Sequence, residues 1–272
     1  MTIWTCATCA IEHPDTPQPP TECAICSDER QWVPRSGQAW TTREDLAERG
    51  YRIVVGELEP DLYAVDCVPE LGIGQRGLLL RSGGRTLLWE PPGFLDEEGV
   101  AEVRALGGVD AIASSHPHLT GSSIQWSHAF GGVPVYVARA DERWIRRPDP
   151  VIELWDDEVE LAPDVRMLAC GGHFAGSSVV HWASGAEGRG VLLTGDTIGV
   201  NADLATVSAM RSYPNYIPLP EKALRRILDV VSPLEFDRLY GAFRVIESGA
   251  SESVARSFER YIAWINGEMP LD

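Results

Sequence analysis

The chain has 272 residues, of which 44% are apolar, a composition that is typical of a globular fold and excludes an intrinsically disordered chain. It carries 40 Asp and Glu against 23 Lys and Arg, and its formal net charge of −17 disfavours nucleic acid and anionic membrane surfaces as partners. We therefore expect a small-molecule substrate or a protein partner. The N-terminus lacks a signal-peptide pattern, and no run approaches the roughly 18 apolar residues of a membrane-spanning helix, so we expect a cytoplasmic protein.

The N-terminal segment contains four cysteines in a metal-binding pattern. Cys6-x-x-Cys9 is followed, after thirteen residues, by Cys23-x-x-Cys26. Two such pairs can converge on one tetrahedral Zn²⁺, and cysteines in a chain without an export signal are expected to stay reduced. Four thiolates leave no open position on the metal, so this site is expected to be structural. Two chance pairs, or a redox C-x-x-C, are the alternative interpretations.

With Trp4 in front of them, these pairs also resemble the rubredoxin-like domain of rubrerythrins, which holds iron in four thiolates. The rubredoxin pattern has a glycine directly after each pair, whereas Ala10 and Ser27 follow the pairs here. Zinc is therefore favoured, with iron as the alternative. We place this four-cysteine ribbon at residues 1–36 and expect it to be separate from the hydrolytic chemistry described below. The main domain then covers residues 37–272.

The main domain begins with helical and strand signals in close succession. Thr41-x-x-Glu44 is a capping box that predicts a helix ending at Gly50. Alternating patterns and turn residues then predict antiparallel strands over 51–59, 62–68, 77–81 and 85–90. A helix over 96–106 follows, and further strands and helices are predicted over 111–114, 122–130, 133–138 and 141–147. Two later helices are predicted over 221–231 and 251–265, the second with an apolar face of Val254, Phe258, Tyr261 and Ile265.

The sequence does not support two common enzyme motifs, the dinucleotide-binding fingerprint and the serine-hydrolase elbow. Gly72-x-Gly74-x-x-Gly77 matches the dinucleotide fingerprint, but a strand and not a helix is predicted after it, so no helix N-terminus is available for a pyrophosphate. The sequence contains no G-x-S-x-G, which argues against the usual serine hydrolases.

The remaining chemistry lies in three short segments, each directly after a predicted strand. They are His116-Pro-His118, the Gly-Gly-His173 turn and Thr-Gly-Asp196. Loops at strand ends are where ligand sites assemble in mixed folds. Three imidazoles and one carboxylate form a workable first set of ligands for a catalytic zinc.

Taken in this order, the segments resemble the metallo-β-lactamase superfamily, whose H-x-H-x-D-H, G-H and T-G-D loops supply metal ligands. The resemblance covers about residues 41–272. It implies an α/β (α+β) fold, namely a four-layer αββα sandwich with a metal site at its edge, and usually hydrolysis by a metal-bound hydroxide. His116, His118 and His173 then correspond to the ligands of one metal, and Asp196 to a residue that bridges to a second.

Several family residues are missing. Thr120 and Gly121 occupy the positions of the Asp and His that bind the second metal, and no late histidine follows the strand near Tyr240. We therefore expect one zinc, held by His116, His118 and His173, whose bound hydroxide attacks a small ester, thioester, lactone or amide. We hypothesise that placing Asp at position 120 and His at position 121 would recover a second metal and two-metal activity.

The missing residues also leave an alternative function open. In this alternative the protein has lost its catalytic activity and binds a metal and a partner, or it is an iron-containing redox protein if the ribbon resembles rubredoxin. Four further residues are interpreted as structural and not as ligands: His128 and His181 as packed or hydrogen-bonded, and Cys67 and Cys170 as buried. The loop over 208–220, rich in aromatic residues and prolines, is interpreted either as a pocket wall or as a rigid connection.

Overall fold

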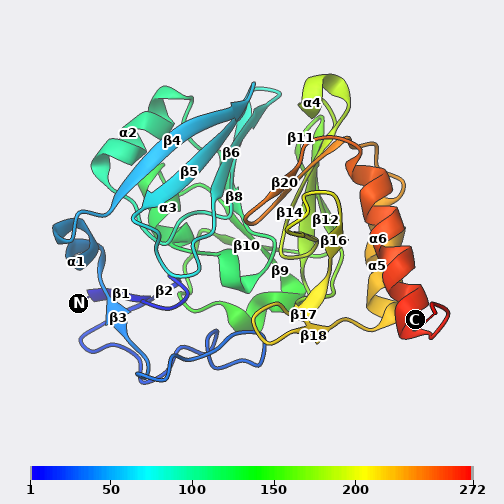
Figure 1. Cartoon of the computed structure of the whole chain (residues 1–272). Helices are drawn as coiled ribbons and strands as arrows, with labels where there is room; N and C mark the ends of the chain where they lie inside the picture. The colour runs from blue at the N-terminus through cyan, green and yellow to red at the C-terminus, as the bar shows by residue number, and fades with distance from the viewer. Residues whose placement is uncertain (1, 271–272) are drawn as a thin grey trace. The chain divides into compact units, whose positions relative to one another are not determined.

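The structure is a computed structural model that describes residues 2–270. Within this range the chain forms two compact units, which meet in the sequence between Trp155 and Asp156. Figure 1 shows the elements of both units, coloured along the chain. Among the described residues, no helix is both long and apolar enough to cross a membrane.

The first unit is built on a seven-stranded sheet with the strand order β10-β9-β8-β7-β6-β5-β4. Strands β4 to β7 pair antiparallel, as predicted, while β8, β9 and β10 continue the sheet in parallel. Helices α2 and α3 pack their apolar side chains on one face of this sheet. The bounds are β4 Arg52–Glu59, β5 Leu62–Val68, β6 Gly77–Ser82, β7 Arg85–Trp89, α2 Glu97–Ala105, β8 Ala111–Ala113, α3 Ser123–Ala129, β9 Val135–Ala138 and β10 Ile152–Trp155.

Two 3₁₀ turns and a short helix complete the first unit. His118 lies on the turn η1 (Pro117–Leu119), which follows β8, and His116 directly precedes this turn. The turn η2 (Arg139–Trp144) replaces the helix predicted over 141–147. Helix α1 (Arg43–Glu48) begins one residue later than the capping box predicted. Thr42 caps it by accepting from the backbone N–H of Asp45 at 3.1 Å, because Thr41 is held in a strand pair with Thr5.

The cysteine segment belongs to this first unit. Strands β1 (Thr2–Cys6), β2 (Glu12–Thr16) and β3 (Trp40–Thr41) form a small sheet in the order β2-β1-β3. The four cysteines form a separate small core beside it, with Ile11 and Ile25. A segment of this length has few other apolar residues to bury, so its fold depends on what the cysteines bind.

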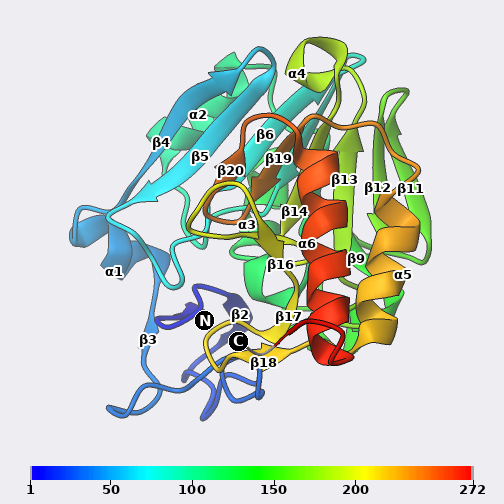
Figure 2. The ribbon, with the colours of Figure 1, turned by 45° about the vertical axis from the view of Figure 1, so that its right-hand side comes forward.

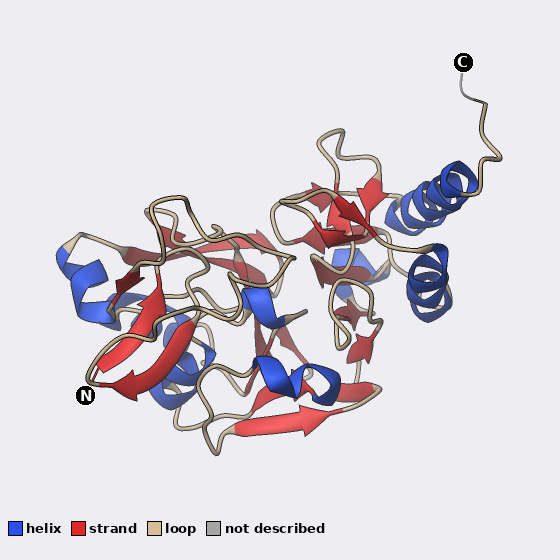
Figure 3. Cartoon of the chain, turned by 90° about the horizontal axis from the view of Figure 1, so that it is seen from below, coloured by secondary structure: helices blue, strands red, loops and turns tan. Residues whose placement is uncertain are grey.

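The second unit is built on a six-stranded sheet with the strand order β11-β12-β13-β14-β19-β20. The long helices α5 and α6 lie side by side along it, as Figures 2 and 3 show, and their apolar faces pack with the sheet into one core. The bounds are β11 Glu158–Ala162, β12 Val165–Ala169, β13 Ser178–Trp182, α4 Gly185–Gly188, β14 Val191–Gly195, β15 Gly199–Val200, β16 Val207–Ser208, β17 Met210–Ser212, β18 Ile217–Pro218, α5 Glu221–Val231, β19 Arg238–Gly241, β20 Val245–Ile246 and α6 Ala250–Ile265.

The two C-terminal helices agree with their predicted ranges, and one packing assignment is wrong. Val254 and Phe258 are buried as expected, but Ile262 and not Ile265 continues the buried face of α6. Ile265 is 44% exposed because it is the last residue of the helix and lies beyond the core of the second unit.

Candidate metal centres

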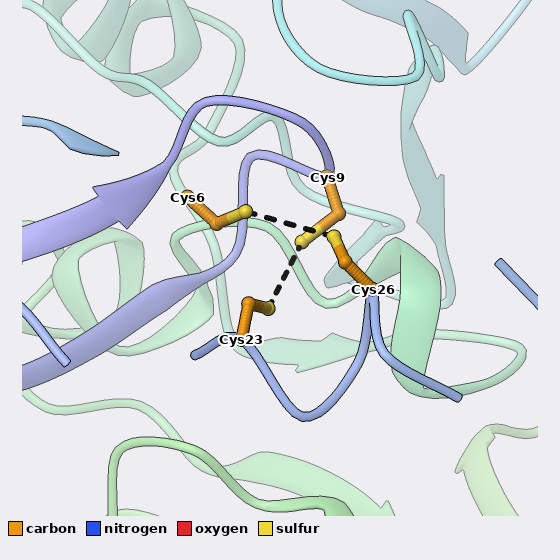
Figure 4. Close-up of side chains that lie close together, drawn as sticks. All are labelled: Cys6, Cys9, Cys23 and Cys26. Atoms are coloured by element: carbon orange, nitrogen blue, oxygen red, sulfur yellow. Dashed lines mark hydrogen bonds between the residues drawn. The ribbon is translucent and has the colours of Figure 1, made fainter. Parts of the chain in front are cut away.

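The four cysteines of the ribbon converge on one point. Figure 4 shows their side chains directed toward a common centre, and the Sγ atoms are 3.6 Å apart for Cys6 and Cys26 and 3.7 Å apart for Cys9 and Cys23. Four sulfurs at 2.3 Å from one tetrahedral ion lie about 3.8 Å from each other. A disulfide requires about 2.05 Å, and all four cysteines are free in this structure. The cluster has the donors and the spacing of a tetrathiolate metal site.

Contacts within and around the cluster shift the pKa values of its thiols in both directions. The pKa of Cys6 and of Cys23 is lowered, which favours their thiolate form, while the pKa of Cys9 and of Cys26 is raised. Hydrogen bonding from Cys26 and from the other two thiols lowers the pKa of Cys23. The side chain of Gln38 donates to the Sγ of Cys6 at 3.1 Å and accepts from the backbone N–H of Cys23 at 3.3 Å. Such outer contacts hold the sulfurs in place around a metal.

The first knuckle is docked tightly on the rest of the unit. Ala10 has a left-handed φ of +61° and lies directly against two glycines. A Cβ atom at Gly72 would lie 2.7 Å from the Cβ of Ala10, and one at Gly93 would lie 2.3 Å from the Ala10 carbonyl oxygen. Gly72, which begins the motif rejected above, therefore serves the docking of the cysteine segment, and no helix opens after it.

A buried carboxylate of the ribbon also contacts the histidine loop. Glu12 accepts a hydrogen bond from the backbone N–H of Ile124, at 2.6 Å, in the first turn of α3. Its other oxygen pairs with Arg147, and its backbone N–H donates to the carbonyl of Gly121 at 3.1 Å. Burial raises the pKa of Glu12, while the charge of Arg147 opposes that shift. Helix α3 has no side-chain cap from Ser122, and Glu12 supplies one from the ribbon.

The hydrogen bonds of His116 leave one ring nitrogen available as a metal ligand. The Ser115 hydroxyl donates to the buried Glu90 carboxylate at 2.5 Å and lies 2.8 Å from Nδ1 of His116. A hydroxyl has one proton, so Ser115 must accept from Nδ1 of His116. This tautomer leaves the lone pair of Nε2 for a metal.

His118 lies beside His116, with ring centroids 5.0 Å apart, and is fully buried. Its Nδ1 is 3.3 Å from the side-chain amide nitrogen Nε2 of Gln31, which comes from the ribbon. The ribbon therefore contacts one of the candidate hydrolytic residues, although the sequence predicted the two to be separate. The contact joins residues that are 87 positions apart in the sequence, and no local pattern pointed to it.

The two positions after the histidine pair are closed to further ligands. Thr120 turns back and donates to the carbonyl of Pro117 at 3.2 Å. Gly121 has a left-handed φ of +49°, and a Cβ atom there would lie 2.0 Å from the carbonyl oxygen of Pro91. A side chain at position 121 therefore requires the 91–92 segment to move, because this segment approaches Gly121 closely. That restoring a histidine there recovers a second metal stays a prediction.

In the second unit, His173 shows the same kind of orientation as His116. Its Nδ1 lies 2.9 Å from the backbone carbonyl oxygen of Met210, which can only accept, so Nδ1 carries the proton and Nε2 keeps its lone pair. His173 is buried, and the glycines at 171 and 172 both have positive φ in the turn that directs it.

Asp196 follows β14, and Tyr213 lies between it and His173. The Tyr213 hydroxyl contacts the backbone carbonyl of Asp196 at 3.1 Å, and its ring centroid is 5.8 Å from that of His173. Burial raises the pKa of Asp196 to about 7. Met210 and Tyr213 both belong to the 208–220 loop, so this loop positions the candidate site residues of the second unit. Its aromatic content was the sequence signal for such a role.

The four residues that the sequence assigned a structural role have contacts outside the two groups of candidate ligands. His181 is 2.8 Å from the carbonyl oxygen of Glu235, and His128 pairs with Asp149 at 3.2 Å. Cys170 is fully buried, and burial raises its pKa to about 12. Cys67 is half-buried in β5 and packs at the edge of the core of the first unit. None of these four belongs to the two groups of candidate ligands.

Comparison with known proteins identifies the family. Residues 77–242, more than half of the chain, match the model of the metallo-β-lactamase superfamily. The chain belongs to the metallo-β-lactamase superfamily. It is also 42% identical to the uncharacterized protein YmaE of Bacillus subtilis (strain 168), over 99% of both chains.

Solved metallo-β-lactamases share this fold. The structure resembles DIM-1 metallo-β-lactamase with a TM-score of 0.56 and 14% identity, over 77% of this chain and 98% of that one. It resembles the mono-zinc form of FIM-1 from Pseudomonas aeruginosa with a TM-score of 0.55 and 13% identity, over 78% and 96%. The resemblance drawn from the histidine and aspartate loops, and the mixed α/β fold that it implied, are thus confirmed. The four-cysteine cluster lies N-terminal to the region that the family model matches.

Proposed function

We propose that this protein is a metal-dependent hydrolase of small activated acyl compounds, namely esters, thioesters, lactones or amides. His116, His118 and His173 would hold one zinc ion, and Cys6, Cys9, Cys23 and Cys26 would hold a second, structural zinc. The observation that carries the proposal is the orientation of the histidines. His116 and His173 each donate Nδ1–H to a fixed acceptor and so keep the Nε2 lone pair for a metal.

Other residues support a single metal at the histidines. A Cβ atom at position 121 would lie 2.0 Å from the carbonyl oxygen of Pro91, and the Thr120 hydroxyl is bonded within its own turn. A divalent cation held by three neutral imidazoles keeps its full charge, acidifies a water molecule and polarises a carbonyl group. The net charge of −17 disfavours polyanionic substrates such as nucleic acids, so a small acyl compound is the proposed class.

Asp196 is the proposed proton acceptor or metal ligand of this site. The aspartate of the family's H-x-H-x-D-H loop is replaced by Thr120, whose hydroxyl is a poor base at neutral pH. Asp196 is the carboxylate of the T-G-D loop, and its pKa of about 7 suits a group that takes up and releases a proton near neutral pH. Its carboxylate would accept the proton of the attacking water, and Tyr213 would hold the Asp196 backbone in place.

Metal analysis of protein purified without added metal, together with a substrate panel, tests the proposal. We expect two zinc ions per chain and hydrolysis of at least one ester, thioester or lactone, which is lost on chelation and recovered with zinc. Three metals per chain would contradict the mononuclear site, and a red protein would place iron in the ribbon. If no panel member is hydrolysed and removal of the histidine-site metal changes nothing, the protein is instead an eroded member that binds a partner.

A further inference from the structure

Within the first unit, Gln31 links the segment of the cysteine cluster to His118. Gln31 is 6% exposed, and its amide nitrogen Nε2 lies 3.3 Å from Nδ1 of His118. It follows Cys26, a member of the cysteine cluster, by only five residues. Gln31 is thus in contact with one centre and tethered by a short stretch of chain to the other.

The stretch between Cys26 and Gln31 is a fixed turn. The backbone N–H of Gln31 donates to the carbonyl of Asp28 at 3.0 Å, and Arg30 forms a buried ion pair with the Asp28 side chain. The guanidinium of Arg30 also lies over the ring of Trp144, 5.7 Å from its centroid. These contacts hold Asp28, Arg30 and Gln31 as one turn, and only Ser27 separates this turn from Cys26. A displacement of Cys26 would act on Gln31 through this short stretch of backbone.

The chemistry of the contact suits a metal ligand. A glutamine amide can present its oxygen or its nitrogen to an imidazole. The atom that faces Nδ1 in the structure is the nitrogen. Rotating the amide by 180° exchanges the nitrogen and the oxygen, and the oxygen then accepts the Nδ1 proton, so that Nε2 of His118 keeps its lone pair. His118 then has the same arrangement as His116 and His173, each of which donates Nδ1–H to a fixed acceptor.

We propose that Gln31 is a positioning residue of the histidine site, which orients His118 for metal binding and couples that site to the cysteine cluster. This inference rests on the proposed function, in which His118 binds a metal. Metal bound in the ribbon holds the turn after Cys26, the turn holds Gln31, and Gln31 fixes the ring orientation and tautomer of His118. Because coupling between two binding sites is reciprocal, a metal on the histidines also stabilises the loaded ribbon.

The test measures metal affinity in the full-length protein. The cysteine site is filled with Zn²⁺, and Co²⁺ is titrated into the histidine site, followed by its visible absorption and by competition with a chelator. We expect Gln31→Ala and Gln31→Leu to bind Co²⁺ ~10- to 100-fold more weakly, the usual effect of removing an outer partner of a metal-binding histidine. Gln31→Leu keeps most of the side-chain volume, and Gln31→Glu keeps an acceptor for Nδ1–H and should restore the affinity.

Gln18→Ala is the matched control, because Gln18 is an exposed glutamine of the same ribbon. Its Co²⁺ affinity should equal that of the wild type. Cys26→Ser should also weaken Co²⁺ binding, and combining it with Gln31→Leu should add little further loss, since both changes act through one contact. If the Cys26→Ser variant does not fold, the Leu and Glu variants at position 31 still decide the question.

Each outcome has a defined meaning. Wild-type affinity in Gln31→Leu would show that the hydrogen bond orients nothing and would overturn the inference while leaving the proposed function intact. A Co²⁺ absorption spectrum of Gln31→Leu at saturating Co²⁺ that shows one ligand fewer than the wild type would indicate that residue 31 binds the metal directly, which also overturns a positioning role. If the wild type binds no metal at its histidines, the proposed function fails, and this inference fails with it.

Discussion

The two candidate metal centres are built in opposite ways. The cysteine cluster is local, since its four ligands come from the first 26 residues and face one another at tetrahedral distances. The histidine and aspartate candidates are distributed, with His116 and His118 in the first unit and His173 and Asp196 in the second. Each distributed residue depends on partners from other segments, such as Ser115, Met210 and Tyr213. Loss of the local site is therefore expected to unfold its own segment. Loss of the distributed site depends on how several loops are positioned.

The largest expected effect comes from the local site. Cys23→Ser removes one of four thiolates from a segment with little other core, and structural zinc supplies on the order of 10 kcal/mol to such folds. We expect one metal to be lost, and limited proteolysis to cut the ribbon before Trp40. Cys67→Ser, at a half-buried cysteine outside the cluster, is the control and should resist proteolysis as the wild type does. A Cys23→Ser ribbon that stays resistant would show that the cysteines hold no metal.

Removing a distributed ligand should have a smaller effect on the fold and a large one on activity. His173→Ala is expected to leave one zinc per chain, in the cysteine cluster, and to lower the hydrolytic kcat/KM by ~10³-fold or more, because the metal loses one of three ligands. His128→Ala changes an exposed histidine on α3 and should keep both metals. Metal counting and kinetics on the same preparations check this, and two metals in His173→Ala would remove His173 from the ligand set.

Asp196→Asn should lower kcat by ~10²-fold, the effect expected for a group that accepts or positions a proton. The metal content separates its two roles. If both metals remain, Asp196 acts on the proton, and if the histidine-site metal is lost, it is a ligand. Asp61→Asn, on an exposed turn between β4 and β5, is the control and should leave kcat unchanged. An unchanged kcat in Asp196→Asn would remove this carboxylate from the chemistry.

The smallest effect concerns the closed second-metal position. Gly121→Ala introduces a Cβ against the carbonyl of Pro91 at a left-handed φ, and we expect the free energy of unfolding to fall by about 2 kcal/mol. Gly56→Ala, on an exposed strand position where nothing lies within 4 Å of the added Cβ, should cost little. Denaturant unfolding measures both. Equal stability of the two variants would mean that the 91–92 segment moves aside easily, and a ligand at position 121 would then be worth testing again.

The sequence by itself determined the features that depend on local spacing. Two C-x-x-C pairs bring four thiolates to one point whatever surrounds them, and alternating apolar patterns located the strands from β4 to β7. The order of the His116-x-His118, Gly-His173 and Gly-Asp196 loops was enough to identify the family. It also predicted that Thr120 and Gly121 stand where the family has ligands of a second metal.

Only the tertiary structure decided the contacts between distant segments. Pairing of Thr41 with Thr5 moved the helix cap to Thr42, and the approach of Pro91 closed position 121. The contact of Gln31 with His118 joins residues 87 positions apart. These contacts depend on how strands and loops pack in three dimensions. The spacing of residues in a single sequence does not predict which distant segments will meet. For the same reason the pattern of residues named the candidate ligands, while their orienting partners became visible only in the fold.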